Sequence, residues 1–326
     1  MLYLESFKFP TWEAEDDFLC HYYDPRSNPD IYKDDYHHKD ISGNYPFGVL
    51  SNHKCYLLDF EPITILYGGN GSGKSTALNV MANVLRMKRH APYNTSVMMD
   101  RYCGLCKYTI SYEFKDEMPL SGLQEVSQII TSDDIFKGFL DRRERNKLKI
   151  AKATILNDII PEVKYNTARP RSLNFETGEN VDEFMQVQSW KKKSYAKIMA
   201  EELGTLEEGY SNGENSLRHL MGALEKEGLY LLDEPENSMS CSFQKSLAEI
   251  IHLSAMRCNT QFIIATHSPF LLAMPDSKIY NLDADPVAPA PWYELDNMRQ
   301  YFELFDSFSE QFNPSPKTKK QWKNNN

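Results

Sequence analysis

A glycine-rich loop between an apolar run and a helical segment constrains this chain more than any other feature. Residues 68–75 read Gly-Gly-Asn-Gly-Ser-Gly-Lys-Ser and fit G-x-x-x-x-G-K-[ST] at every fixed position. Residues 63–67 before the loop are prone to form a β-strand, and residues 76–85 after it predict a helix. Because strand, loop and helix in this order are the context that the motif requires, we expect an α/β fold with a parallel or mixed sheet.

This loop predicts binding of a nucleoside triphosphate with Mg²⁺. Glycines let backbone N–H groups close around phosphates, and the helix that follows adds its positive N-terminal end. Lys74 is expected to reach the β- and γ-phosphates, and the Ser75 hydroxyl to ligand Mg²⁺. A glycine-rich turn that binds nothing is the alternative, and it requires all the fixed positions to coincide by chance. The expected nucleotide contacts are Gly68, Gly69, Asn70, Gly71, Ser72, Gly73, Lys74, Ser75 and Thr76.

Composition narrows the class of protein. The 326 residues suffice for about two domains, and 41% hydrophobic residues suffice for a sizeable core. A net charge of −10 argues against wrapping DNA over the whole surface, although a local basic patch remains compatible with it. No apolar run approaches the length of a membrane span, and the first ten residues lack signal-peptide features, so we expect a cytoplasmic protein.

Six scattered cysteines fit a reducing compartment. Cys103 and Cys106 form a single C-x-x-C, and no second pair stands at the spacing of a zinc ribbon. A redox pair or half of a metal site is one interpretation. We favour coincidence, because nothing else in the sequence completes either site.

The first half of the chain predicts several strands. Residues 1–10, 55–60 and 108–114 read as strands, and we expect an antiparallel β part near the N-terminus. Residues 11–50 read as an ordered but irregular segment. The helix after the glycine loop is expected to run to about Lys88.

The middle of the chain predicts a helical arm inserted into this domain. Asp133 or Asp134 is expected to cap a helix that runs to Ile160 and ends at Pro161, and a second helical segment spans residues 184–203. The predicted domain boundaries are 1–132 for the first half of a nucleotide-binding domain, 133–206 for the arm, 207–312 for the second half, and 313–326 for a flexible tail.

The arm reverses the charge of the chain. Residues 141–200 hold 13 Lys or Arg against 8 Asp or Glu. One interpretation is a contact surface for DNA, RNA or an acidic partner. The other is a solvated helix face, which we favour because the basic residues are not interleaved with stacking aromatics.

Two later apolar runs end in groups that complete a hydrolytic site. Residues 228–234 form a strand-like run that ends in Asp233 and Glu234, as a buried parallel strand would. Asp233 is expected to lie beside Mg²⁺, and Glu234 to polarise the attacking water as general base. A further apolar run, residues 261–266, ends at His267, which is placed to bond the γ-phosphate or that water.

Between the glycine loop and these runs lies Ser211-Asn212-Gly213-Glu214. Ser211 with Glu214 three residues later is an ordinary capping box, so a plain helix start is one interpretation. Serine, glycine and a helix N-terminus together also form an anion site, which is the other.

The order of these motifs resembles that of ABC-type ATPases. Asp233-Glu234-Pro235-Glu236-Asn237-Ser238-Met239-Ser240 is similar to the run found in soluble ABC-type AAA-family ATPases, which include RecF, SMC and OLD-like heads of DNA repair and anti-phage defence. The resemblance implies that Ser211, Gly213 and Glu214 act on ATP held by an opposite subunit. It also implies that Asn237 and Ser238 communicate across the dimer, and that His267 is the switch histidine.

Two departures from the family pattern leave positions open. No clean glutamine loop is present, although Asp133, with Gln128 nearby, stands where one is expected. No aromatic clearly stacks on adenine, and Tyr56 and Phe60 are the candidates.

The sequence therefore predicts an ATP-hydrolysing homodimer that moves a helical arm, in DNA maintenance or anti-phage defence, with an effector such as a nuclease. The alternatives are the ATP-binding subunit of a membrane transporter and a nucleotide-dependent scaffold with negligible turnover. The missing glutamine loop, the Glu-Asn-Ser continuation and the inserted arm favour the first over the transporter.

Overall fold

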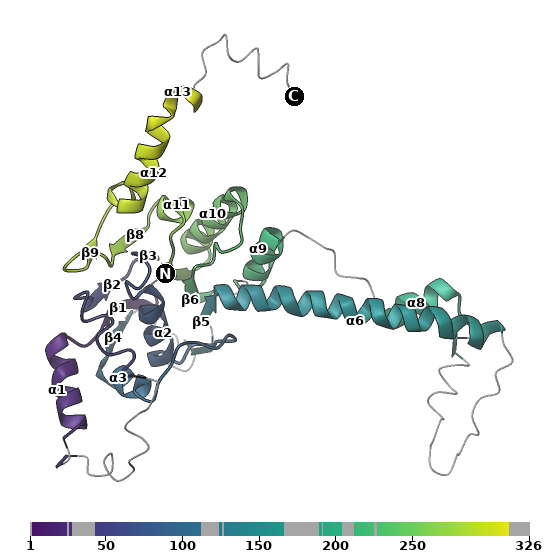
Figure 1. Cartoon of the computed structure of the whole chain (residues 1–326), viewed down its shortest axis with the longest axis horizontal. Coiled ribbons are helices and arrows are strands. Elements are labelled where there is room, and N and C mark those ends of the chain that lie inside the picture. The colour runs from purple at the N-terminus through teal and green to yellow at the C-terminus, as the bar shows by residue number, and fades with distance from the viewer. Residues whose placement is uncertain are drawn as a thin grey trace. The chain divides into compact units, whose positions relative to one another are not determined.

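The computed structural model describes residues 2–24, 26–27, 43–111, 124–125, 127–165, 189–190, 192–203, 212–224 and 227–312. The chain divides into two compact units (Figure 1). The first comprises residues 1–135 and 216–326, and the second comprises residues 136–215. The boundaries of 133 and 206 predicted from the sequence remain a prediction.

The first unit is built on a six-stranded sheet in the order β5-β6-β7-β3-β8-β9. All neighbouring strands are parallel except β8 and β9, which pair antiparallel. The expected α/β class with a parallel or mixed sheet is confirmed. The strands are β3 (Ile63–Tyr67), β5 (Gln128–Thr131), β6 (Gly228–Asp233), β7 (Thr260–Ala265), β8 (Lys278–Asn281) and β9 (Ala288–Pro289).

A smaller antiparallel sheet, β2-β1-β4, supplies the antiparallel part expected near the N-terminus. Its strands are β1 (Leu4–Lys8), β2 (Leu57–Asp59) and β4 (Lys107–Ile110). Gln261 on β7 joins the two sheets, because its side chain accepts hydrogen bonds from the backbone N–H groups of Tyr3 and Leu4 and donates one to the Leu4 carbonyl. The smaller sheet is thereby fixed to the strand that leads to His267.

Helices flank the sheets of the first unit. α2 begins directly after the glycine loop and, with α3, contributes to the core that also holds the inner face of the smaller sheet. α10 and α11 pack with the other core, which lies around β3, β6 and β7. The helices of the first unit are α1 (Trp12–Tyr22), α2 (Lys74–Val84), α3 (Met99–Leu105), α10 (Cys241–Arg257), α11 (Pro269–Leu272), η3 (Trp292–Glu294), α12 (Asp296–Ser307) and α13 (Ser309–Phe312). The helix α9 (Asn212–Ala223) begins in the second unit and continues into the first.

Three predicted elements need correction. Residues 12–22 form the helix α1, although no helix was expected before residue 50, because the Thr11 hydroxyl caps the first turn and Glu13 and Glu15 favour its N-terminus. α2 ends at Val84 rather than near Lys88, where Lys88 instead pairs with Gln128 beside β5. The first helix of the arm continues through Pro161 to Tyr165.

The second unit contains most of the long helix α6 (Ser132–Tyr165) and the helix α8 (Tyr195–Leu203). Leu156, Ile160, Trp190 and Ile198 form its buried cluster. Lys152 pairs with Glu202 at 2.9 Å and Lys193 with Glu201 at 2.6 Å. The unit thus has a small core of its own, and these two lysines of the basic segment are engaged within it. Residues 184–188 of the predicted second helix lie outside the described residues.

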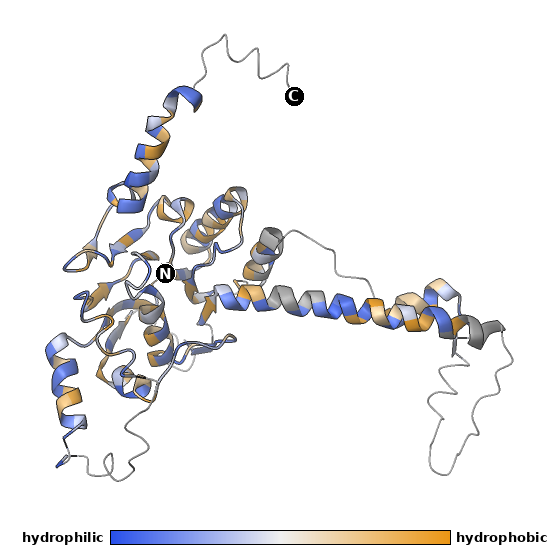
Figure 2. Ribbon diagram, viewed as in Figure 1, coloured by the Kyte–Doolittle hydropathy of each residue, from blue (hydrophilic) through white to orange (hydrophobic). Residues whose placement is uncertain are grey.

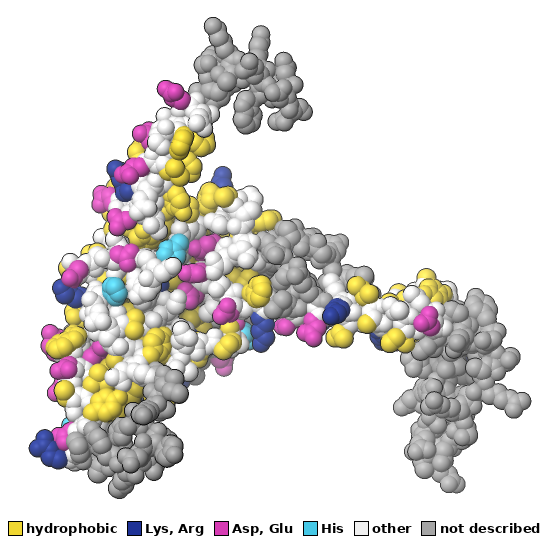
Figure 3. Space-filling view, in the orientation of Figure 1, with side chains coloured by type: hydrophobic (Ala, Val, Ile, Leu, Met, Phe, Trp, Pro, Cys, Tyr) yellow, Lys and Arg dark blue, Asp and Glu magenta, His cyan; other side chains and the backbone are white. Residues whose placement is uncertain are grey.

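The helix α12, which precedes α13 near the end of the described residues, carries an apolar face that is largely exposed. Hydrophobic and hydrophilic residues alternate around it with helical spacing (Figure 2). Leu295 and Met298 at its start join the core around β3, whereas Tyr301, Phe302 and Phe305 are exposed. Hydrophobic side chains lie at the surface of this part of the chain (Figure 3). Among the described residues, α12 is therefore anchored to the core by its beginning.

No helix among the described residues is long and apolar enough to cross a membrane.

Candidate active site

The glycine loop connects β3 to α2 in the first unit. All five residues of β3 are buried, and the loop turns at Gly71 and Gly73, which have φ angles of 87° and 92°. A Cβ atom on Gly73 would lie 2.9 Å from a methyl group of Leu50, so a side chain there would collide as well as strain the backbone. The loop geometry and the close packing of residues 49 and 50 therefore depend on this glycine.

Lys74 is turned onto its own loop. Its ammonium donates hydrogen bonds to the Gly68 carbonyl at 2.8 Å and the Gly69 carbonyl at 3.0 Å. The side chain is buried, and burial lowers the pKa of Lys74, while the carboxylates of Glu234, Asp283 and Asp233 oppose that shift. A cation held at this loop provides the positive charge that a triphosphate needs.

The strand ends of the large sheet bring the second half of the site to the loop. The Ser75 hydroxyl on α2 donates a hydrogen bond to the Asp233 carboxylate at 3.0 Å, across 158 residues of sequence. Burial raises the pKa of Asp233 to about 6, and the Ser75 hydrogen bond opposes that shift. A hydroxyl and a carboxylate at this separation are the hard oxygen ligands that Mg²⁺ prefers, so these residues fit the metal expected from the sequence.

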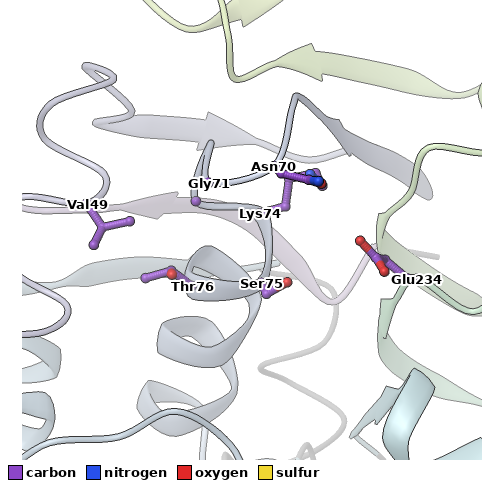
Figure 4. Close-up of a pocket in the computed structure, with 8 residues that line it drawn as sticks. Val49, Asn70, Gly71, Lys74, Ser75, Thr76 and Glu234 are labelled. Carbon is purple, nitrogen blue, oxygen red and sulfur yellow. The ribbon is translucent and has the colours of Figure 1, made fainter. Parts of the chain in front are cut away.

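Glu234 follows at the end of β6 in an unusual backbone conformation. Its φ angle is 48°, in the left-handed region, and its N–H donates to the Ala265 carbonyl on β7 at 2.9 Å. The carboxylate accepts a hydrogen bond from Asn237 at 3.0 Å and lines the pocket beside Lys74 and Ser75 (Figure 4). This backbone turn lets the side chain point into the pocket rather than into the sheet.

His267 faces the same carboxylate from the end of β7. Its Nε2 lies 3.9 Å from Glu234 Oε1, which is too long for a direct hydrogen bond. Nε2 is buried and has no hydrogen-bond partner among the described residues. Burial and then the charge of Lys74 lower the pKa of His267, which favours the neutral ring at neutral pH. A neutral imidazole and a carboxylate therefore face each other here without a direct hydrogen bond.

Glu236 is a residue that the sequence analysis did not single out. It is buried, and its Oε1 accepts hydrogen bonds from the Thr266 hydroxyl at 2.5 Å and from the N–H groups of His267 and Ser268 at 3.0 and 3.1 Å. Burial raises the pKa of this carboxyl, and the hydrogen bonds oppose the rise. Glu236 thus ties the loop after β6 to the segment that carries His267. Its position in the Asp-Glu-Pro-Glu-Asn-Ser run was the only sequence signal.

We predict that Glu236→Ala lowers the free energy of unfolding by about 2 kcal/mol or more, because the buried Thr266 hydroxyl and the part-buried His267 N–H lose their acceptor, whereas the Ser268 N–H keeps the Thr266 hydroxyl. Glu236→Gln keeps one acceptor oxygen and is expected to cost less than half as much. Urea unfolding of both variants against the wild type measures this order. Equal stability of all three proteins would show that the network adds nothing to the fold.

Asp283 after β8 is a second residue that the sequence did not reveal. Its carboxylate accepts a hydrogen bond from the Gly69 N–H at 2.7 Å. The loop is therefore held from the β8 side as well as by Lys74.

Gln128 and Asp133 are the two candidates for the glutamine-loop position. Gln128 pairs with Tyr230 at the start of β5, whereas Thr131 pairs with Asp233 at the pocket end. Asp133 is exposed, and Asp134 is the buried carboxylate that accepts hydrogen bonds from the N–H and hydroxyl of Thr131. The end of β5 thus carries Asp134 rather than a glutamine.

Other predicted residues fall beyond this site. Ser211 lies outside the described residues, and Gly213 and Glu214 lie in the first turn of α9. Phe60 is buried, its N–H bonds the Glu5 carbonyl beside the small sheet, and neither Phe60 nor Tyr56 lines the pocket. Cys103 and Cys106 pack against the core around the small sheet, where burial raises the pKa of Cys103 to about 11 and that of Cys106 further.

The chain was compared with known proteins. Residues 136–273 match the family described as "AAA domain, putative AbiEii toxin, Type IV TA system". That match contains Asp233, Glu234 and His267 but not the glycine loop. No curated protein matches the sequence.

Solved structures with similar folds include two SMC head domains and a transporter. An SMC head with an extended coiled coil bound to the C-terminal domain of ScpA, from Pyrococcus furiosus, has a TM-score of 0.36 and 14% identity, covering 78% of this chain and 95% of that one. An SMC head bound to the C-winged helix domain of ScpA has a TM-score of 0.36 and 18% identity, covering 75% and 94%. A putative metal-chelate type ABC transporter in an inward-facing conformation has a TM-score of 0.33 and 15% identity, covering 74% and 78%. All three TM-scores are below 0.5, so no property of these proteins is assigned to this chain.

The family match covers the segment from the arm to beyond His267. The glycine loop lies outside that match, and its Ser75 donates a hydrogen bond to Asp233 within it. Together they fit a soluble ATPase of the ABC-type AAA class of P-loop proteins.

Proposed function

We propose that this chain binds ATP with Mg²⁺ in the pocket at the glycine loop and hydrolyses it. The observation that carries the proposal is the hydrogen bond between Ser75 and Asp233, because it joins the two halves of the expected metal site at the edge of one sheet. The match of residues 136–273 to an AAA domain family supports nucleotide binding. Bound Mg²⁺ would neutralise phosphate charge as it develops during transfer.

Three side chains then act on the phosphates and on the attacking water. Lys74 exchanges its hydrogen bonds with the Gly68 and Gly69 carbonyls for phosphate oxygens, with little loss because both are charge-assisted. Glu234 takes a proton from the attacking water. His267, neutral and 3.9 Å from that carboxylate, orients the water or the terminal phosphate.

We further propose that two chains sandwich ATP head to tail. Ser211, Gly213 and Glu214 of one chain would then act on the terminal phosphate held by the other, as the resemblance to ABC-type ATPases implies. Asn237 donates a hydrogen bond to Glu234 and would thereby link contacts with the partner chain to the general base. Hydrolysis would separate the first units of the two chains. It would thereby shift the equilibrium of the arm, residues 133–206, between two conformations.

The resemblance to RecF, SMC and OLD-like heads suggests a role in DNA maintenance or anti-phage defence, with an effector such as a nuclease. The family description names a putative toxin of a type IV TA system, which is compatible with a defence role. Binding of DNA or RNA by the arm has less support. The ion pairs of Lys152 and Lys193 within the second unit favour a solvated, internally paired helix face. Expression of the chain with its neighbouring genes, followed by phage challenge, tests the defence role.

Specific ATPase activity is expected to rise with protein concentration until the dimer saturates, because each site needs residues from two chains. Phosphate release measured over a thousandfold dilution series with excess Mg²⁺ and ATP tests this. An activity per chain that stays constant over the whole series would exclude the shared site, while measurable turnover would still support hydrolysis.

A further inference from the structure

The pocket at the glycine loop has two chemically different ends. It encloses about 410 Å³, and Figure 4 shows Glu234 at one end and Val49 at the other, with Thr76 nearest to Val49. Its lining residues are Val49, Asn70, Gly71, Gly73, Lys74, Ser75, Thr76 and Glu234. Of these, Val49 alone comes from neither the glycine loop, nor α2, nor the end of β6 that Glu234 follows, and it is the one large apolar side chain.

Val49 is held in place by contacts on both sides. The buried carboxylate of Glu15 on α1 accepts hydrogen bonds from the Gly48 N–H at 2.7 Å and the Ser51 hydroxyl at 2.8 Å. Leu50 is fully buried, and its methyl group lies against Gly73. The turn that carries Val49 is thus bonded to α1 and packed on the glycine loop, so Val49 is a fixed part of the pocket wall.

The charges fix the direction in which a nucleotide lies. The terminal phosphates belong where Lys74, Ser75, Asp233 and Glu234 meet, since these groups supply the cation, the metal ligands and the base. The nucleoside must then extend toward Thr76 and Val49. The Thr76 hydroxyl already accepts a hydrogen bond from Tyr45 at 3.3 Å, and the glycines there carry no side chains.

We infer that Val49 is the apolar platform on which the base and ribose pack, and that this site selects nucleoside triphosphates with little regard for the base. The inference rests on the proposed function and extends its substrate class from ATP to nucleoside triphosphates with other bases, GTP first among them. Base discrimination by large factors requires polar groups that the wrong base leaves unpaired. Among the described lining residues, the Val49 end offers this apolar contact and one hydroxyl, that of Thr76, which the Tyr45 hydroxyl already engages.

Affinity is the direct test, because it does not require turnover. Competition of ATP, GTP and CTP against a fluorescent ATP analogue should give ATP and GTP dissociation constants within about tenfold of each other. Val49→Trp should tighten both by about tenfold through stacking. Val49→Thr, nearly isosteric but more polar, should weaken both by about threefold. Val97→Ala is the matched control, since Val97 is 64% exposed and does not line the pocket.

A preference for ATP over GTP beyond tenfold, or Val49 variants that bind like the wild type while melting at the same temperature, would overturn the inference. The proposed hydrolysis is separable from it. If the triphosphates bind as expected but none releases phosphate, the hydrolytic role fails and the platform stands. If ATP alone binds and is hydrolysed, the hydrolytic role stands and the platform fails.

Discussion

Glu234→Gln is expected to lower ATP turnover by about 10²- to 10⁴-fold while leaving ATP affinity within a few-fold of the wild type. Glutamine can still hold a water molecule by a hydrogen bond, but it cannot accept the proton that the attacking water gives up. The backbone of residue 234 tolerates the change, since its left-handed conformation and its bond to Ala265 do not involve the carboxylate.

The same variant is also expected to accumulate as an ATP-bound dimer, because hydrolysis is what releases the two chains in the proposed cycle. Size-exclusion chromatography with light scattering, in Mg²⁺ and ATP, measures the mass directly. Glu249→Gln is the matched control, since Glu249 is exposed on α10 and removes the same charge.

Three results separate the parts of the proposal. Normal turnover in Glu234→Gln would show that Glu234 is not the general base. Slow turnover without a dimer would keep the base and remove the sandwich. Slow turnover with a dimer that also forms in ADP would mean that the terminal phosphate is not what holds the chains together.

The parts of the site that the sequence predicted are those that local physics determines. The glycine loop needs residues with positive φ, and glycine adopts such angles without steric strain, so the pattern can be recognised from the sequence alone. β6 and β7 are buried apolar runs whose carboxyl ends meet at one sheet edge because the strands are parallel. This is why Asp233 and Ser75 could be expected together although 158 residues separate them.

The parts that were missed depend on tertiary placement. Glu15 lies on a short helix whose apolar periodicity is weak, and its role is clear only once the helix packs beside residues 48–51. Asp283 and Glu236 bond backbone groups of loops that are distant in sequence. Backbone donors carry no residue signature, so no spacing rule reveals such pairs. Val49 likewise has no motif, and only its position against Gly73 shows where it lies.

Lys74→Ala is expected to weaken ATP binding by about a hundredfold or more. Lys74 is the cation among the pocket-lining residues described here, and Glu234, Asp283, Asp233 and Glu236 all act on its charge. Without it, a highly charged triphosphate would enter a pocket whose side-chain charges are carboxylates. A unit charge about 4 Å away at an intermediate dielectric contributes about 4 kcal/mol, which solvent and Mg²⁺ reduce only in part.

Lys54→Ala is the control for this change, because it removes the same charge from an exposed pair with Asp285 and should bind ATP like the wild type. Isothermal titration calorimetry with ATP in the presence of EDTA measures the loss without hydrolysis or metal binding. The ADP affinity of Lys74→Ala should fall less than its ATP affinity, because ADP lacks the γ-phosphate that Lys74 is expected to reach. Equal losses for ATP and ADP would place the Lys74 ammonium at the β-phosphate alone, and no loss for either would remove the glycine loop from nucleotide binding.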